Sequence, residues 1–468
     1  MDCMAKKKSK GLDPSKKLAK SLKKEAKKNP KGFFIALAIV LVLALSCVGV
    51  YLYLNHKGLL RNPENDSSSE SSSQYVSLQG DCDPISFHFI DREEPYSGDS
   101  IYVKAGDKDI LIDAGARKGS ASAIKDYLCD SGRGGDYVAD GKLEYVISTH
   151  GHQDHIAGFV GNVDAKSPGG RNGLFHTFKI DNLIDFSYYD SNDGHSVINN
   201  ADPSNSKGNE RFVDYSSTYR TPGGKDSAHV SALYKDYVAS RDYAISQGTI
   251  WRTASGLMEN SQGESYTVEL GKNLAMTVLY SYFYDHTSAE VAGLESSYKR
   301  SSFSDQNDYS VSLLFTQGSR NFLFTGDSEA YAEHSLAKYN ALPPHVDLFK
   351  AGHHGSYTAS GEELLSRVTP SLCVVTCCAG NTEYASGASH TFPAQEFLDR
   401  ISAYTDRVYV TTLGDMKDKS KFAPFNGNVV VSYSGESEES LLCSNSSSKL
   451  KDSEWMKANR VMPASWAT

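Results

Sequence analysis

The chain has 468 residues, enough for one large or two ordinary domains, and its composition (39% hydrophobic, 22% charged) is that of a folded protein. Residues 1–32 carry twelve lysines against three acidic residues, so residues 33–468 hold 36 basic and 54 acidic side chains, a balance of −18. This negative balance, with no stretch of interleaved aromatic and basic residues, argues against extended nucleic-acid binding.

An uninterrupted apolar segment, FFIALAIVLVLALSCVGVYLYL, occupies residues 33–54. At about 1.5 Å per residue it spans the roughly 30 Å hydrocarbon core of a bilayer, which predicts one transmembrane helix. The apolar region of a cleaved signal peptide is shorter, about 7 to 15 residues, so a signal anchor is favoured. The lysine-rich tail 1–32 precedes the helix, and the positive-inside rule therefore predicts a cytoplasmic N-terminus in the cell membrane and an extracytoplasmic C-terminal part.

The Ser-rich stretch 55–80 reads as a flexible linker, followed by a folded domain at 81–445 and a C-terminal tail at 446–468. Apolar or alternating runs predict strands at 85–90, 100–105, 109–115, 143–149, 274–283, 309–316, 321–327, 346–352, 371–376, 407–412 and 428–434. Helices are predicted at 328–340, at 360–368 with Ser360 and Glu363 in capping-box spacing, and at 393–404. This mixture indicates a layered α/β protein.

Residues 161–262 differ from their surroundings, being rich in Gly, Ser, Asn, Asp and Tyr, with one convincing helix at 227–245. We interpret them as an insertion that forms a lid or a substrate wall, since binding residues tend to lie on loops over a rigid scaffold.

Six cysteines follow the apolar segment, and they allow fifteen pairings. Cys373, Cys377 and Cys378 lack the spacing of a structural zinc site, and core packing is expected for them. A bond between Cys82 and Cys443 would join the ends of the domain.

The stretch STHGHQDHIAG, residues 148–158, contains three histidines and an aspartate directly after a predicted strand. Because alternate residues of a strand share a face, His150 and His152 can present both imidazoles to one metal ion. Asp154 and His155 follow on a turn that enters a helix, which aims a carboxylate and a third imidazole at a neighbouring point. Histidine and carboxylate suit zinc, and the pattern predicts a metal site.

Three other predicted strands end in residues of the same kind. ILIDAG ends at Asp113, FLFTGD at Asp327, and DLFKAGHH at His353 and His354. Taken alone, Asp-Ala-Gly and Gly-Asp are ordinary turn sequences, and a pair of histidines can simply be exposed.

Taken in order, these segments resemble the metallo-β-lactamase superfamily, and in particular the hydrolase domain of the competence protein ComEC. The resemblance covers residues 85–435 without the insertion. It rests on ISFHFID...GDSIYVKAGDKDILIDAG, STHGHQDHIAG, NDYSVSLLF with NFLFTGDSE, VDLFKAGHHGSYTAS, CCAGNTEYASGASHTFP and the closing VYVTT...FNGNVVVSYSG. It implies an αββα sandwich.

The resemblance also implies roles for individual residues. His150 and His152 would bind one metal, Asp154 and His155 a second, with Asp327 between them. His353 would complete the second site, His354 would face the substrate, and Asp113 would orient ligands from behind. The third ligand of the His150 and His152 site stays open among His176, His195, His229 and His286. Asn381 and His390 are candidates for substrate contact or for an ordinary loop role.

These assignments predict a hydrolase with two Zn²⁺ ions, or Mn²⁺, that attacks a small or short phosphoester or phosphodiester with metal-bound hydroxide. Asp154 would orient the nucleophile, and His354 or His390 would assist the leaving group. The alternatives are a membrane-tethered binding module without turnover, a β-lactam or thioester hydrolase of the same superfamily, and an iron oxidoreductase. The oligomeric state is not predicted.

Overall fold

The computed structural model describes residues 81–130, 135–186, 232–260, 264–284, 306–382, 387, 390–415, 421–434 and 438–467. The chain divides into two compact units, 1–74 and 75–468, and all described residues belong to the second. The tail 1–32, the apolar segment 33–54 and the linker 55–80 therefore lie outside them. None of the helices in the described ranges has the length and apolar character needed to cross a bilayer.

Two eight-stranded sheets form the centre of the described unit. The first has the order β17 (Glu438–Cys443), β16 (Val429–Ser434), β1 (Ile85–Phe89), β2 (Ile101–Ala105), β3 (Lys108–Ile112), β5 (Lys142–Ile147), β6 (Lys179–Asp185) and β7 (Ile250–Thr253). The second has the order β15 (Phe422–Pro424), β14 (Val408–Gly414), β13 (Cys373–Ala379), β12 (Leu348–Lys350), β11 (Arg320–Phe324), β10 (Leu313–Gln317), β9 (Leu274–Val278) and β8 (Tyr266–Gly271). A short strand, β4 (Gly135–Asp136), lies apart from both.

The sheets face each other across an aromatic core. The ring of Phe87 on β1 lies 5.5, 4.8 and 5.2 Å from the rings of Phe315, Phe322 and Phe324 on β10 and β11. All four side chains are buried, so alternation along these strands supplies the inner faces of both sheets.

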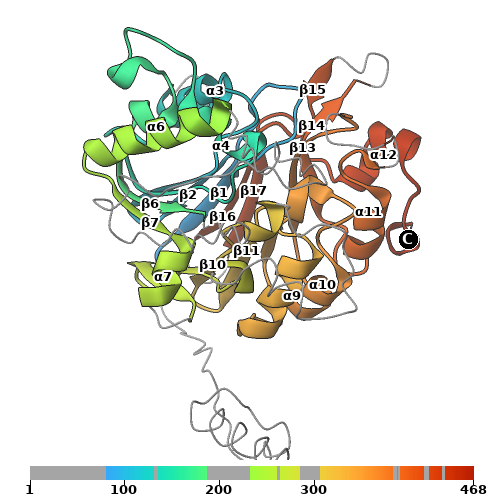
Figure 1. The fold of residues 1–468 in the computed structure, drawn as a ribbon. Coiled ribbons are helices and arrows are strands. Elements are labelled where there is room, and N and C mark those ends of the chain that lie inside the picture. Colours follow the sequence, from blue (N-terminus) through green and yellow to red (C-terminus); the bar gives the residue numbers. More distant parts are fainter. Residues whose placement is uncertain are drawn as a thin grey trace, which may run out of the picture. The chain divides into compact units, whose positions relative to one another are not determined.

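Helices cover the outer faces (Figure 1). On the side of the first sheet lie α3 (Ser120–Cys129), α4 (Gln153–Val160), α5 (Leu174–Thr177) and α6 (Ala232–Ser246), with α7 (Ala254–Asn260) near its edge. On the other side lie α9 (Ala330–Tyr339), α10 (Glu362–Val368), α11 (Gln395–Ile401) and α12 (Glu454–Asn459). The order helix, sheet, sheet, helix is the predicted layered α/β architecture. Single turns of 3₁₀ helix are η1 (Pro168–Gly170), η3 (Tyr282–Tyr284), η4 (Gln306–Tyr309), η5 (Gly352–Gly355), η7 (Leu450–Asp452) and η8 (Ala464–Trp466).

All eleven predicted strand runs contain strands, but the region 161–262 is more than an insertion. Its strands β6 and β7 extend the first sheet in parallel, with Ile147 of β5 beside Ile184 and Asp185 beside Thr253. Helix α6 confirms the predicted helix from Ala232 onward and packs against α4, while residues 227–231 of that prediction lie outside the described ranges. Only residues 187–231 and 261–262 of this region lie outside the described ranges.

The stretch 446–468 is not a loose tail, which corrects the predicted domain end. It forms η7, α12 and η8, and Leu450, Trp455, Met456 and Trp466 are buried in the core between the second sheet and its helices. The indole Nε1 of Trp466 donates to the carbonyl of Thr405 at 2.9 Å. The folded domain therefore continues to the last described residues.

Two local predictions were wrong. Gly361, not Ser360, precedes α10, and the carboxylate of Glu333 accepts from the backbone N–H groups of both residues in place of a capping box. No disulfide joins Cys82 to Cys443 in the described part of the chain.

Candidate metal centre

The metal-like motif occupies the junction between β5 and α4. His150 follows the end of β5, while Asp154 and His155 lie in the first turn of α4. The helix approaches the loop after β3 closely, because the N–H of Gly158 donates to the carbonyl of Ala114 at 3.1 Å. A Cβ on Gly158 would lie 2.0 Å from that oxygen, so this contact requires glycine.

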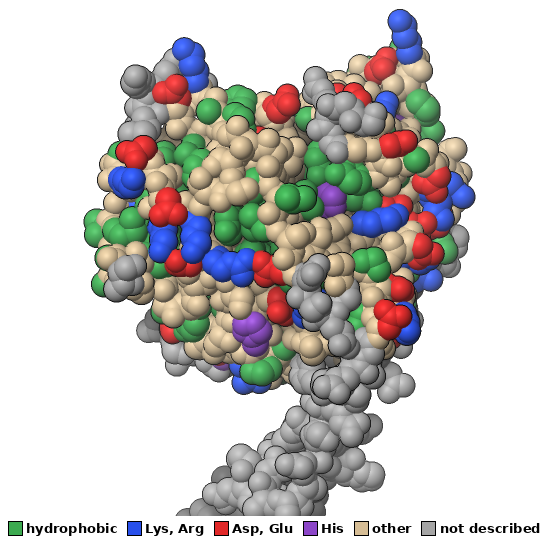
Figure 2. Space-filling model, turned by 180° about the vertical axis from the view of Figure 1, so that it is seen from behind, with side chains coloured by type: hydrophobic (Ala, Val, Ile, Leu, Met, Phe, Trp, Pro, Cys, Tyr) green, Lys and Arg blue, Asp and Glu red, His purple; other side chains and the backbone are tan. Residues whose placement is uncertain are grey.

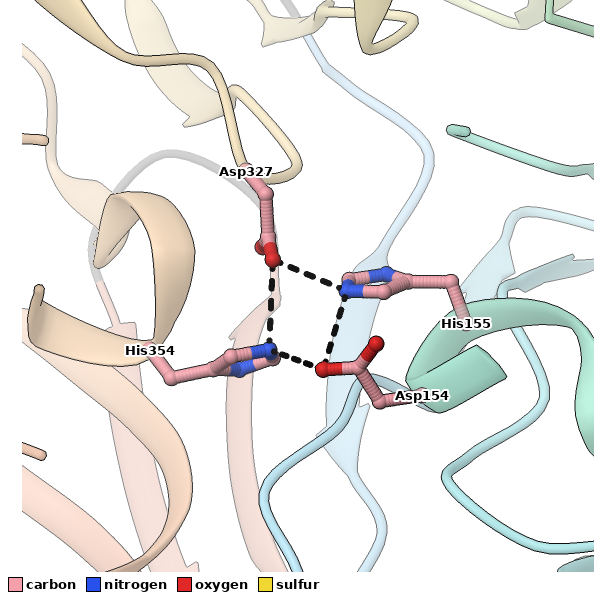
Figure 3. A group of neighbouring side chains, drawn as sticks. All are labelled: Asp154, His155, Asp327 and His354. Carbon is pink, nitrogen blue, oxygen red and sulfur yellow. Dashed lines mark hydrogen bonds and ion pairs between the residues drawn. The ribbon is translucent and has the colours of Figure 1, made fainter. Parts of the chain in front are cut away.

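Four buried side chains from distant parts of the chain converge there: Asp154, His155, Asp327 and His354 (Figure 3). The first two come from α4, the third from the loop after β11 and the last from η5. Asp327 Oδ2 lies 3.1 Å from His155 Nε2 and 3.3 Å from His354 Nε2, and Asp154 Oδ2 lies 3.9 and 3.3 Å from the same nitrogens. Two nitrogens and two oxygens thus face a common point.

The spacing of these atoms fits a metal ion. Ligands about 2.0 to 2.2 Å from a tetrahedral zinc lie roughly 3.3 Å apart. Three of the four distances cluster there, whereas N–H···O hydrogen bonds centre on about 2.9 Å. Neither ring nitrogen of the buried His354 makes a hydrogen bond within the described structure. A cation bound by Nε2 would satisfy the one that faces the cluster.

Each of the two histidines has a carboxylate behind it. His155 Nδ1 lies 2.7 Å from Asp113 Oδ2, and His354 Nδ1 lies 3.3 Å from Asp99 Oδ1. Asp113 also accepts from the backbone N–H and the hydroxyl of Thr149, directly before His150. Such partners fix ring orientation and tautomer at metal sites.

Asp99 and Lys350 were not identified from the sequence. Lys350, at the end of β12, is fully buried, with its Nζ 2.5 Å from Asp99 Oδ2 and 3.4 Å from Asp327 Oδ1. Two features of the sequence could have identified them. Lys350 lies inside the apolar run VDLFKAG, where a buried charge needs a partner, and Asp99 lies in the GDS segment at residues 98–100.

The centre carries excess negative charge. Burial alone would lower the pKa of His354, yet the carboxylates of Asp327 and Asp99 raise it to about 10. Burial likewise opposes protonation of His155, but Asp327, Asp113 and Asp154 raise its pKa well above the usual range. Protons are thus drawn to nitrogens that a divalent cation would otherwise occupy.

His150 and His152 form a pair at the edge of this cluster. His150 Nε2 lies 3.1 Å from His152 Nδ1 and 3.9 Å from Asp327 Oδ2. Burial lowers the pKa of His150 well below its usual range, so its ring is neutral, the form that binds metals. The two nitrogens face each other, and the ion that they would share stays a prediction.

The third ligand of this pair is still unassigned. His176 has its Nδ1 3.0 Å from the carbonyl of Pro168, and its ring stacks on Tyr243 of α6. These contacts give His176 a structural role, in which its ring packs between η1 and α6. His195, His229 and His286 lie outside the described residues.

His354 lies in the four-residue cluster, where His353 was expected, and His353 lies beside it. His354 is fully buried within the cluster, whereas His353 has 19% of its side chain exposed, with Nε2 3.9 Å from Asp327 Oδ2. His353 Nδ1 lies 3.1 Å from Glu329 Oε1. Both residues have left-handed φ angles, 44° and 54°, which turn the rings in directions that sequence order does not reveal.

The two weaker candidates lie on the loops near η5. The amide of Asn381 donates to the carbonyl of Pro95, which is a loop contact. The ring of His390 stacks on Tyr357 at 4.3 Å, and Tyr357 is 44% exposed. Neither residue is part of the four-residue cluster.

The sequence of this chain is similar to known proteins in the region that carries the motif. The profile of the Metallo-beta-lactamase superfamily matches residues 94–170, which include Asp113 and the whole motif. Recombination protein 2 of Haemophilus influenzae is 26% identical over 137 residues, which are 26% of this chain and 16% of that protein. ComE operon protein 3 of Bacillus subtilis is 27% identical over 107 residues, 23% of this chain and 13% of that protein. The matched part of the chain thus spans less than a fifth of either relative.

Solved structures give weaker matches. The metallo-beta-lactamase fold protein YhfI from Bacillus subtilis is 12% identical with a TM-score of 0.34, covering 75% of this chain and 100% of that one. Human tRNase Z, short form, is 9% identical with a TM-score of 0.28, covering 70% and 93%.

Proposed function

We propose that the chain is a metal-dependent hydrolase of phosphoesters or phosphodiesters. The match of residues 94–170 to the Metallo-beta-lactamase superfamily and the similarity to Recombination protein 2 and ComE operon protein 3 support this proposal. The observation that carries this proposal is the convergence of Asp154, His155, Asp327 and His354 on one point. Zn²⁺ or Mn²⁺ bound there would lower the pKa of bound water towards neutrality and neutralise charge on phosphoryl oxygens.

Different side chains would bind the metal, orient the nucleophile and protonate the leaving group. The rings of His150, His152, His155 and His354 would supply nitrogen ligands, and Asp327 Oδ2 lies 3.9 Å from His150 Nε2, 3.1 Å from His155 Nε2 and 3.3 Å from His354 Nε2. Asp154 Oδ2 is the acceptor that would orient a nucleophile. His353 is the more exposed of the adjacent histidines, and Glu329 fixes its Nδ1, so its Nε2 would give a proton to the leaving oxygen.

The distribution of charge supports a small substrate. On the face drawn in Figure 2, Lys and Arg side chains are interspersed with Asp and Glu, so no single basic surface extends across it. A short phosphodiester needs only the metal centre and a few local contacts, whereas a long nucleic acid needs a row of cationic groups.

We further propose that residues 33–54 anchor the chain in a membrane with the hydrolase domain on the outer side. The support is the 22-residue uncharged segment and its lysine-rich flank. Protease added to intact cells should remove the C-terminal part, and protection of that part would contradict the orientation.

The enzymatic proposal is tested on the full-length chain. Bound metal is measured, and a chromogenic phosphodiester, a β-lactam and a thioester are offered to the wild type, to Asp154→Ala and to Asp107→Ala. Asp107 is a matched control because it is 81% exposed on a turn. We expect phosphodiester hydrolysis that Asp154→Ala alone abolishes. A metal-loaded protein that cleaves only the β-lactam or thioester would overturn the phosphoester assignment. A metal-loaded protein that cleaves none of the three would overturn the proposal that the chain is a hydrolase.

A further inference from the structure

Lys350 is a buried cation inside an acidic centre. Asp99, Asp113, Asp154 and Asp327 are at most 5% exposed, and Lys350 is fully buried among them. Its Nζ also donates to the carbonyl of Gly326 at 3.0 Å. Burying an ammonium group is costly unless it is paired and hydrogen-bonded, and here two carboxylates and one carbonyl provide the partners.

These contacts connect Lys350 to two members of the metal cluster. On one side it contacts Oδ1 of Asp327, which leaves Oδ2 as the oxygen that faces the histidines. On the other side it pairs with Oδ2 of Asp99, whose Oδ1 lies beside His354 Nδ1 and accepts from the hydroxyl of Thr376. Asp99 therefore lies behind His354 much as Asp113 lies behind His155, at 3.3 Å from Nδ1 where Asp113 is at 2.7 Å.

The backbone is built for this arrangement. The N–H of Asp99 donates to the carbonyl of Asp154 at 3.1 Å, and its own carbonyl accepts from Gly115 at 2.7 Å. A Cβ on Gly98 would lie 2.6 Å from the same Asp154 oxygen, and Gly98 has a φ of 154°. The loop before β2 is thus held against the first turn of α4, which carries Asp154 and His155.

We infer that Asp99 and Lys350 are positioning residues that aim His354 Nε2 and Asp327 Oδ2 at the metal ion of the cluster. This inference rests on the proposed function, since it assumes that the cluster binds a metal. Neither residue is a member of the four-residue cluster. The pair neutralises the surplus of carboxylates, and it fixes one oxygen and one ring.

The test is Co²⁺ and Zn²⁺ binding by the full-length chain, with the visible absorption of bound Co²⁺ as the report on ligand geometry. The double variant Asp99→Asn/Lys350→Met removes both charges together, so that neither is left unpaired in the interior. The matched control is Lys104→Met/Asp109→Asn, an ion pair of 2.9 Å between β2 and β3. Circular dichroism checks that each variant is folded.

We expect the double variant to bind metal about tenfold to hundredfold more weakly, with an altered Co²⁺ spectrum, while the control matches the wild type. Wild-type affinity and spectrum in the double variant would overturn the inference alone. No metal uptake by the wild type would overturn the proposed function and this inference with it.

Should the double variant not fold, Asp99→Asn decides the matter. Its amide keeps the shape and an oxygen acceptor for the His354 ring but loses the charge that pairs with Lys350. A changed Co²⁺ spectrum supports the inference, and an unchanged one overturns it.

Discussion

Nδ1 of His155 lies 2.7 Å from Oδ2 of Asp113, and this contact leaves Nε2 of the ring facing Asp327 and Asp154. Asp113→Asn places an amide N–H₂ group or an uncharged oxygen against that nitrogen. We therefore expect metal affinity to fall about tenfold to hundredfold, measured by competition with a chromophoric chelator. Asp107→Ala, at an exposed turn, should bind as the wild type. Equal affinities for all three proteins would show that Asp113 does not orient the ligand.

His354 and His353 should respond differently to substitution by alanine. His354→Ala removes a nitrogen from the four-residue cluster, so at least one bound metal should be lost. His353→Ala should keep its metal but lose phosphodiesterase turnover, because the ring is more exposed and lies beside the cluster. Metal analysis and kinetics on the same samples separate the two effects. The reverse pattern would restore the assignment expected from sequence order.

Tyr237 of α6 connects the end of β6 to the segment that carries the motif. Its hydroxyl lies 2.7 Å from Oδ1 of Asp185 and 2.7 Å from Oγ of Ser148, all of them buried. Tyr237→Phe leaves both partners without this contact and should lower the free energy of unfolding by about 1–3 kcal/mol in urea titrations. Tyr243→Phe, on a half-buried part of the same helix, is the control and should change it little. A loss no larger than that of the control would count against this network.

His88 should make stability depend on pH. Burial lowers its pKa from 6.5 to about 4, and the ring contacts Tyr127 and Ser86. Between these values the unfolded chain binds a proton that the folded chain does not, so the stabilisation is complete above about pH 6.5 and is lost towards pH 4. The loss amounts to about 3 kcal/mol. His88→Gln should have a correspondingly flatter profile in urea unfolding from pH 7.5 to 4.5, and parallel profiles would refute the assignment.

The C-terminal segment should contribute to stability. Trp455 is 4% exposed, and Arg460 lies over its ring. Trp455→Ala should cost about 3–5 kcal/mol, since a large buried ring is lost. Val461→Ala is the comparison, because Val461 is 74% exposed. Similar unfolding free energies for the two variants would contradict a structural role for the segment.

Sequence patterns predicted the central strands because these runs are apolar or strictly alternating. They missed β6, KIDNLID, because three of its seven residues are charged at neutral pH and one is an asparagine. Those polar groups find partners only in the folded state: Asp185 accepts from Tyr237 and Trp251, and Asp181 pairs with Lys142. The C-terminal helix was missed for a similar reason. It has few apolar residues, and they are buried only when the helix packs against the second sheet.

At the metal centre, the residues that follow strands directly were found, because strand ends place side chains at one edge of a sheet. The roles of His353 and His354 depend on backbone angles inside η5, which residue order does not encode. Asp99 precedes β2 of the first sheet and Lys350 ends β12 of the second, and the two form an ion pair. Sequence patterns do not reveal such a pair, because it forms only when the two sheets pack together.

The first sheet has a consequence for how the chain folds. β1 lies between β2 and β16, so Ile85 pairs with both Ala105 and Tyr433. During synthesis, β1 therefore keeps one unpaired edge until almost the whole domain has emerged, and pairing so distant in sequence is slow. An exposed edge is a template for aggregation. Chains truncated before β16 should accumulate as insoluble protein, whereas nascent full-length chains would depend on chaperones for that interval.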